Sequence, residues 1–308
     1  MNETTKPKKR EILPIILMGC FFIVINGLAL LLTTTFVNAG FKVFQNASDP
    51  LNLVWLFVMI LGITVIILLI ARFWKKRLIQ IIILFSVGYT AFYIFLPLLA
   101  LVLASDWMII LISILLAVLL VAILVKYPEW YVIDLCGIVI GTGAVALFGI
   151  SLSILLVIIF LIGLAIYDAI SVYKTKHMID LADTVMDLKL PVLLVIPKIR
   201  RYSLIKETKR LKESLKEGEE RDAFFMGLGD VVMPGILVVA VYTNVQNGLP
   251  VALSVIAGTL VGFAVLMTLV IKGKPQAGLP LLCSGAILGY VVSSLVLFSQ
   301  LVGLGLSF

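Results

Sequence analysis

The stretch SLSILLVIIFLIGLAIYDAISVY (residues 151–173) contains a single charged residue, Asp168. A second apolar stretch, AFFMGLGDVVMPGILVVAVYT (residues 223–243), likewise contains only Asp230. Each is long enough to cross the hydrocarbon core of a bilayer, which takes about 20 apolar residues. A carboxylate at the centre of that core costs about 2.5–3.5 kcal/mol on insertion scales, so such residues usually have a function and a partner. Both stretches border the same hydrophilic segment, which makes each aspartate the natural partner of the other.

The composition of the whole chain is that of an integral membrane protein. Hydrophobic residues make up 62% and charged residues 13% of the 308 residues, far from soluble globular proteins. A continuous helix over residues 131–173 would be about twice the hydrocarbon thickness, so we divide this run near Gly149, Ser151 and Ser153. The sequence therefore predicts an all-α polytopic membrane protein with nine transmembrane helices, at residues 12–36, 51–71, 78–100, 107–125, 131–148, 151–173, 223–243, 249–271 and 279–302.

Basic residues predict the orientation of these helices, because Lys and Arg accumulate in short cytoplasmic loops. With a cytoplasmic N-terminus and an external C-terminus, every one of the 24 basic residues except Lys42 lies on the cytoplasmic side. The net charge of +7 is then explained by anionic lipid beside the membrane, so we expect membrane lipid and no nucleic acid as a partner. We place the protein in the cell membrane as a multi-pass protein.

The hydrophilic segment divides the chain into three parts: an N-terminal six-helix membrane part (1–173), a cytoplasmic loop (174–222) and a C-terminal three-helix membrane part (223–308). Within the loop, LPVLLVIP (190–197) is too short to span, is bounded by prolines and is rich in branched residues. It is predicted to be an interfacial segment or an exposed strand.

The glycine pairs, Asp134 and the three cysteines of the membrane part are interpreted as structural. Glycines four residues apart permit close helix contact, as at Gly137 and Gly141, and the same spacing recurs at 258 and 262 and at 285 and 289. Asp134 lies near the membrane interface, where its burial costs less. The three cysteines form no CxxC pair and have no metal-ligand spacing, so we expect them to pack between helices, and we expect no metal site.

Depth along the helices predicts that the two aspartates lie at one level. Asp168 precedes Lys174 by six residues, about 9 Å inside the cytoplasmic boundary, and Asp230 lies about 12 Å inside it on the returning helix. Two carboxyls a few ångströms apart in a low dielectric do not both ionise, so the pair holds one proton near neutral pH. The ionised member can take a proton from an attacking water while the other donates to the developing oxyanion. This pattern indicates a membrane-embedded aspartyl protease.

Three sequence elements stand out: YD at the end of the sixth span, GLGD in the seventh, and a Leu-Pro element that opens the ninth. In these elements, and in span order over nearly the whole chain, the sequence resembles the presenilin and signal peptide peptidase family. The family's Pro-Ala-Leu motif falls on AGLP here, with its first proline and its alanine replaced. The resemblance implies that Asp168 and Asp230 are catalytic and that the surrounding motif or backbone residues are Tyr167, Gly227, Leu228, Gly229, Ala277, Gly278, Leu279 and Pro280.

The resemblance also implies what the protein acts on. The cytoplasmic N-terminus matches presenilins, whereas signal peptide peptidases have the reverse orientation. Substrates are then single-span transmembrane proteins whose N-terminus faces outside, cleaved without a metal or organic cofactor. Substrates of the family pair as strands near the loop and the seventh helix, which gives residues 190–197 a docking role. An oligomer is compatible with the sequence.

Other classes of intramembrane protease, and transporters, would require other residues or another arrangement of the spans. A zinc protease needs a ligand set such as HExxH, and the one histidine, His177, lies in the loop. A rhomboid-type serine protease needs a membrane histidine, and a prepilin peptidase needs a lysine two residues after GxGD, where Val232 stands. The main alternative is an ion or solute transporter or channel that uses both aspartates as a cation or proton site. It predicts matching interrupted segments in two halves, and the nine unequal spans show no clear internal repeat.

Overall fold

The computed structural model describes residues 9–73, 76–175, 193–198, 223–271 and 276–304. These residues form nine α-helices, as many as the predicted spans. They also form one two-stranded antiparallel sheet that was not predicted, called the hairpin below although a long segment joins its strands. Most of the predicted cytoplasmic loop, including His177, lies outside the described residues. The elements in chain order are α1 (Lys9–Asn38), α2 (Leu51–Phe73), α3 (Lys76–Ala100), α4 (Asp106–Lys126), α5 (Trp130–Ser151), α6 (Ile154–Ile170), the π-helical turn η1 (Ser171–Thr175), β1 (Leu193–Pro197), β2 (Ala223–Gly227), α9 (Leu228–Asn244), α10 (Leu249–Ile271) and α11 (Gly278–Phe298).

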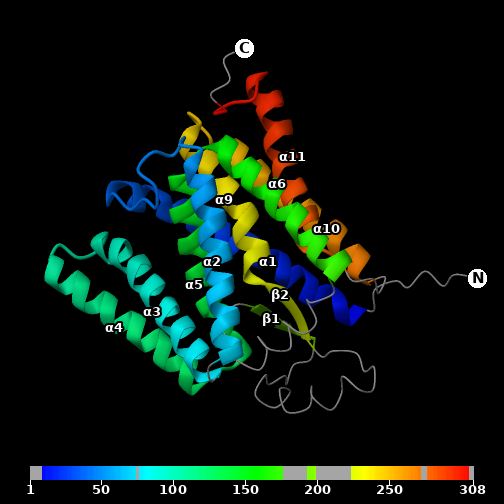
Figure 1. Ribbon diagram of the computed structural model, residues 1–308. Helices are drawn as coiled ribbons and strands as arrows, with labels where there is room; N and C mark the ends of the chain where they lie inside the picture. The colour runs from blue at the N-terminus through cyan, green and yellow to red at the C-terminus, as the bar shows by residue number, and fades with distance from the viewer. Residues whose placement is uncertain (1–8, 74–75, 176–192, 199–222, 272–275, 305–308) are drawn as a thin grey trace, which may run out of the picture.

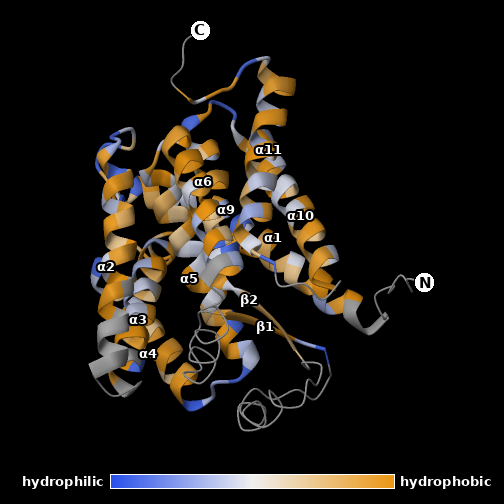
Figure 2. Cartoon of the chain, turned by 45° about the vertical axis from the view of Figure 1, so that its right-hand side comes forward, coloured by the Kyte–Doolittle hydropathy of each residue, from blue (hydrophilic) through white to orange (hydrophobic). Residues whose placement is uncertain are grey.

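The helices have the length and the surface of membrane-spanning segments. Within the described residues seven are long and apolar enough to cross a bilayer, and the apolar helical stretches Leu51–Ile63 and Leu228–Asn244 are shorter. Hydrophobic residues predominate along the helices (Figure 2), and many of their large apolar side chains are exposed, among them Leu31, Phe85 and Trp107 at 72%, 71% and 82% exposure. Such a surface would aggregate in water but matches lipid tails, so the protein is an integral multi-pass membrane protein.

The predicted division between the fifth and sixth helices is confirmed. Helix α5 ends at Ser151 and α6 begins at Ile154, with Ser153 at its N-cap. The Ser151 hydroxyl donates to the Leu147 carbonyl and accepts the Val43 amide at 2.7 Å. This side chain therefore ties the turn to the loop after α1.

The prediction that residues 223–243 form one helix is wrong at its start. Residues 223–227 form strand β2, and α9 begins only at Leu228. Strand β2 pairs with β1 in antiparallel register, from Leu193 opposite Gly227 to Pro197 opposite Ala223. The pairing satisfies backbone groups that a helix would otherwise satisfy, and aromatic and branched residues favour it. Of the two predictions for residues 190–197, the strand is correct over 193–197.

The side chains of the hairpin alternate between two parts of the core. Leu194, Ile196 and Met226 pack with residues of α1 and α9, whereas Val195 and Ala223 pack with residues of α3, α4 and α5. This is the two-residue period of a strand that is buried on both faces. The hairpin is therefore part of the core, with β1 lying against α5 and β2 leading directly into α9 (Figure 1).

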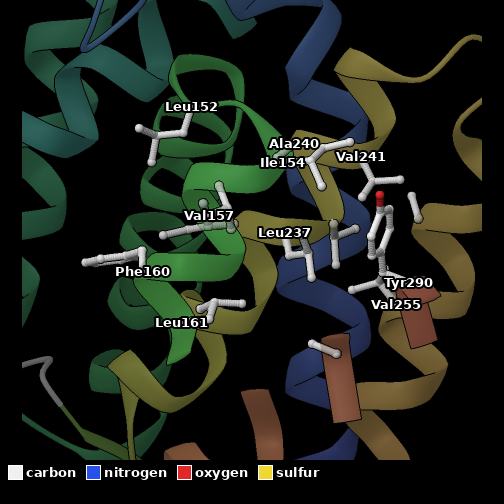
Figure 3. Packing of buried hydrophobic residues seen from close by; sticks show 14 of the residues in the cluster. Leu152, Ile154, Val157, Phe160, Leu161, Leu237, Ala240, Val241, Val255 and Tyr290 are labelled. Carbon is white, nitrogen blue, oxygen red and sulfur yellow. The ribbon is translucent and has the colours of Figure 1, made fainter. Parts of the chain in front are cut away.

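Helix α9 lies at the centre of the bundle, against α1, α5, α6, α10 and α11 (Figure 1). Its residues 234–241 are all buried, as expected for a helix that is apolar on every side. Leu237 and Val241 of α9 belong to one cluster with Phe160 of α6, Val255 of α10 and Tyr290 of α11 (Figure 3). The helix that carries Asp230 is thus held on all sides.

The predicted close helix contact at the glycine pairs is confirmed between α10 and α11. A Cβ atom on Gly258 would lie 2.2 Å from the Gly285 carbonyl oxygen, and one on Gly285 would lie 2.3 Å from the Gly258 oxygen. Backbones approach this closely only when both residues lack a side chain. The pair in α5 has a different neighbour, because Gly137 and Gly141 face Leu194 of β1 and Leu228 of α9.

Candidate active site

Asp168 lies on α6, just before the helix passes into the π-helical turn η1. Its Oδ2 accepts the Leu279 amide at 3.1 Å, and the Gly278 amide also bonds this carboxyl group. These are the first two amides of α11, which have no carbonyl partner within their own helix. The positive end of α11 therefore faces a carboxylate, the arrangement that favours negative charge.

Asp230 lies in the first turn of α9, three residues after the N-cap residue Gly227. Its carboxyl group bonds the Gly227 amide, as the third residue of a helix does when it reaches back to the cap. A second carboxyl group is thus held at a helix N-terminus.

The two carboxyl groups meet around Gly278. While the Gly278 amide bonds Asp168, a Cβ atom on the same residue would lie 3.4 Å from Oδ2 of Asp230. Both carboxylates also interact electrostatically with each other and with the buried thiol of Cys283. The sequence predicted only packing for this cysteine, and the structure places it in the core cluster around α9, within electrostatic range of both acids. Both aspartates remain partly exposed.

Gly229 provides open space beside Asp230. It is exposed, and a Cβ atom built on it would meet nothing within 4 Å among the described residues. On the other side of the carboxyl group, a Cβ atom on Gly227 would lie 3.4 Å from Oδ2 of Asp230. One glycine of GLGD therefore packs against the acid and the other leaves room for a second backbone to approach.

The remaining predicted motif residues lie at different places around the dyad. Tyr167 is 67% exposed on the outer face of α6, so its side chain faces away while that of Asp168 faces α11. Leu228 packs against the two glycines of α5. Ala277 is 2% exposed and caps α11, and Pro280 occupies the first turn, where a missing amide costs nothing. The AGLP sequence thus forms a regular helix start despite its two replacements.

Asp134 has a partner that the sequence did not predict. It is 5% exposed on α5, and its Oδ1 accepts the Val195 amide of β1 at 2.8 Å. The sequence does show a lone acid on an apolar helix, but it does not indicate that the partner of this acid is the amide of a strand. Across the described residues no three His, Cys, Asp or Glu side chains are grouped closely enough to hold a metal ion.

Comparison with known proteins connects this geometry to one family. The family model described as "Signal-peptide peptidase, presenilin aspartyl protease" matches residues 19–299. Two solved structures of a presenilin family intramembrane aspartate protease, in space groups C222 and P2, are similar at 34% and 35% identity and a TM-score of 0.69 each. Both comparisons cover 92% of this chain, and they cover 99% and 98% of the other. None of the curated proteins matches.

Proposed function

The chain belongs to the signal-peptide peptidase and presenilin family of aspartyl proteases, and we propose that Asp168 and Asp230 are its catalytic dyad. As a member of this family the protein is a hydrolase, an intramembrane aspartic endopeptidase. The observation that carries the assignment is the shared neighbour Gly278: its amide bonds the carboxyl group of Asp168, and a Cβ atom added to it would lie 3.4 Å from Oδ2 of Asp230.

The proposed reaction needs one proton on the pair. The ionised aspartate accepts a proton from a water molecule as the water oxygen attacks the scissile carbonyl carbon, and the protonated aspartate donates to the carbonyl oxygen. When the tetrahedral intermediate collapses and the C–N bond breaks, the aspartate that took the water proton donates it to the leaving amine nitrogen. The other aspartate takes a proton back from a hydroxyl group of the intermediate, so the pair again holds one proton. The first turns of α9 and α11 stabilise the single negative charge of the dyad. Water reaches the acids through their partly exposed side.

We propose that β2, rather than residues 190–197, offers the docking edge for substrate. The Val195 amide bonds Asp134 on α5, so in antiparallel geometry it points away from β2. Its pairing partner Phe225 then directs its own amide and carbonyl away from β1, along the edge that leads to Asp230. An unwound segment of a single-span substrate that pairs with this edge would bring its backbone to the open space at Gly229.

The proposed topology follows the distribution of basic residues. The N-terminus is cytoplasmic, the C-terminus is external, and the loop 174–222 divides a six-helix part (1–173) from a three-helix part (223–308). The dyad and the hairpin then lie near the cytoplasmic face of the cell membrane. Membrane lipid and single-span proteins are the proposed partners. Labelling of single cysteines placed at residues 5 and 306 in sealed vesicles tests the two ends.

Cleavage of a single-span peptide by the purified protein in detergent tests the dyad. Asp168→Asn and Asp230→Asn should each abolish the fragments, because the pair then has only one ionisable carboxyl group. Asp106→Asn is the matched control, since it removes an exposed carboxyl group at the start of α4 and should cleave like the wild type. Undiminished cleavage by either dyad variant would remove the assignment. Proton or cation flux into vesicles, lost in both dyad variants while cleavage is absent from the wild type, would instead indicate a transporter.

A further inference from the structure

We propose that Asp134 is a positioning residue that holds the β1–β2 hairpin on α5 and so fixes both Asp230 and the edge of β2. This inference rests on the proposed function of the dyad and of that edge. It starts from the bond between Asp134 Oδ1 and the Val195 amide, which is the only polar contact between α5 and β1 recorded among the described residues.

The Val195 amide depends on Asp134 for its hydrogen bond. It points away from β2, so the ladder cannot satisfy it, and it lies in a strand that is buried on both faces. A buried amide without an acceptor is costly, whereas the carboxylate supplies an acceptor at 2.8 Å. The bond therefore selects one height and one register of β1 along α5.

The same face of α5 also contacts apolar side chains of β1 and of the first turn of α9, the helix that carries Asp230. Gly137 and Gly141 follow Asp134 by three and seven residues, so the three positions share a helix face. A Cβ atom on Gly137 would lie 3.0 Å from Leu194 Cδ2, and one on Gly141 would lie 3.2 Å from Leu228 Cδ1. Leu194 precedes the tethered strand residue, and Leu228 opens α9. Asp134 and the two glycines thus form a seat for the end of the hairpin at which β1 begins and β2 passes into α9.

The path from this seat to the catalytic acid is short. Val195 pairs with Phe225, and two residues later Gly227 bonds the Asp230 carboxyl group. A shift of β1 along α5 would move β2 with it, and β2 is continuous with α9. Asp134 therefore acts on the reaction through the hairpin, without contact to substrate.

Asp134→Asn and Asp134→Leu test the inference as a pair of similar size. Asparagine keeps the Oδ1 acceptor, so kcat/KM should remain within about threefold of the wild type. Leucine removes the acceptor and should lower kcat/KM about tenfold or more, with a raised KM and faster hydrogen exchange at the Val195 amide. If Asp134 only stabilised the fold, KM would stay the same in both variants, because loss of folded enzyme lowers only the apparent kcat.

Two glycine variants provide the second measurement if Asp134→Leu does not fold. Gly137→Ala pushes on Leu194 of the hairpin, whereas Gly88→Ala places its methyl group 3.1 Å from Val121, between α3 and α4. The first should raise KM and the second should not. Equal KM in the folded Leu and Asn variants, or in the two glycine variants, would overturn the inference, as would an Asn variant as impaired as the Leu variant. Failure of the dyad assignment shows separately, as cleavage by Asp168→Asn or Asp230→Asn.

Discussion

A methyl group added to Gly258 should force α10 and α11 apart. Its carbon would lie 2.2 Å from the Gly285 carbonyl oxygen and 3.0 Å from the Gly289 α-carbon. An unstrained C···O contact is about 3.3–3.6 Å, so the helices must separate by about 1 Å. Overpacking costs about 1–3 kcal/mol, and the upper end applies here because the opposing atoms are backbone and cannot change rotamer. Alanine returns about 0.5–1 kcal/mol as the better helix former. Gly258→Ala should therefore lower the free energy of unfolding by about 2 kcal/mol.

The measurement needs a control that separates crowding from the general effect of alanine. Gly27 of α1 and Gly62 of α2 are also helical, and a Cβ atom on either would meet nothing within 4 Å in the described structure. Gly27→Ala and Gly62→Ala should be neutral or stabilising by up to about 1 kcal/mol. Unfolding of the three variants by SDS in mixed micelles, followed by circular dichroism, compares them directly.

Gly258→Ala should also disturb the dyad, because α11 presents the Gly278 and Leu279 amides to Asp168. Peptide cleavage by Gly258→Ala should fall at detergent conditions where the variant is still folded, and that by Gly27→Ala should not. If Gly258→Ala unfolds at the same SDS fraction as the controls, the backbone contact between α10 and α11 is wrong.

Three further substitutions address other contacts. Gly149→Ala in α5 should destabilise by about 1–3 kcal/mol and reduce cleavage, since its methyl carbon would lie 2.4 Å from a valine side chain of the dyad helix α9; unchanged thermal unfolding would contradict that contact. Ser151→Ala removes the acceptor of the Val43 amide and should cost about 1–3 kcal/mol, with faster hydrogen exchange at Val43 as the local readout. Tyr290→Phe removes a 2.6 Å bond to the Val302 carbonyl and should cost about 0.5–1.5 kcal/mol without altering KM; a changed KM would place Tyr290 in the substrate path.

Hydropathy alone predicted the number of helices and most of their ends. The limits of a spanning segment are set by the bilayer, which acts on each segment separately, so no knowledge of neighbouring segments is needed. Even the break at Ser151 followed from length, because one helix across residues 131–173 would overshoot the hydrocarbon layer. The ninth helix ends at Phe298, four residues before the predicted residue 302, where Ser299 at the C-cap adopts a left-handed conformation with a φ of 57°.

The hairpin was missed because it depends on a pairing between distant segments. Residues 223–227 are as apolar as the helix that follows, and an apolar run of five residues does not distinguish strand from helix. The deciding interaction is with residues 193–197, on the far side of a polar segment. The buried acid on α5 was unexplained for the same reason, since its partner is an amide of that strand.

The start of α9 at Leu228 also explains how the dyad is held, which the sequence did not reveal. If the helix ran through residues 223–227, the Gly227 amide would bond a carbonyl of the preceding turn and would not be available to Asp230. Because β2 ends there, that amide is an unpaired helix donor, and the acid three residues later can bond it. The same holds for α11, whose first two amides bond Asp168. A pair of acids in an apolar bundle is thus held by the ends of two helices, and the strand that precedes α9 is part of that arrangement.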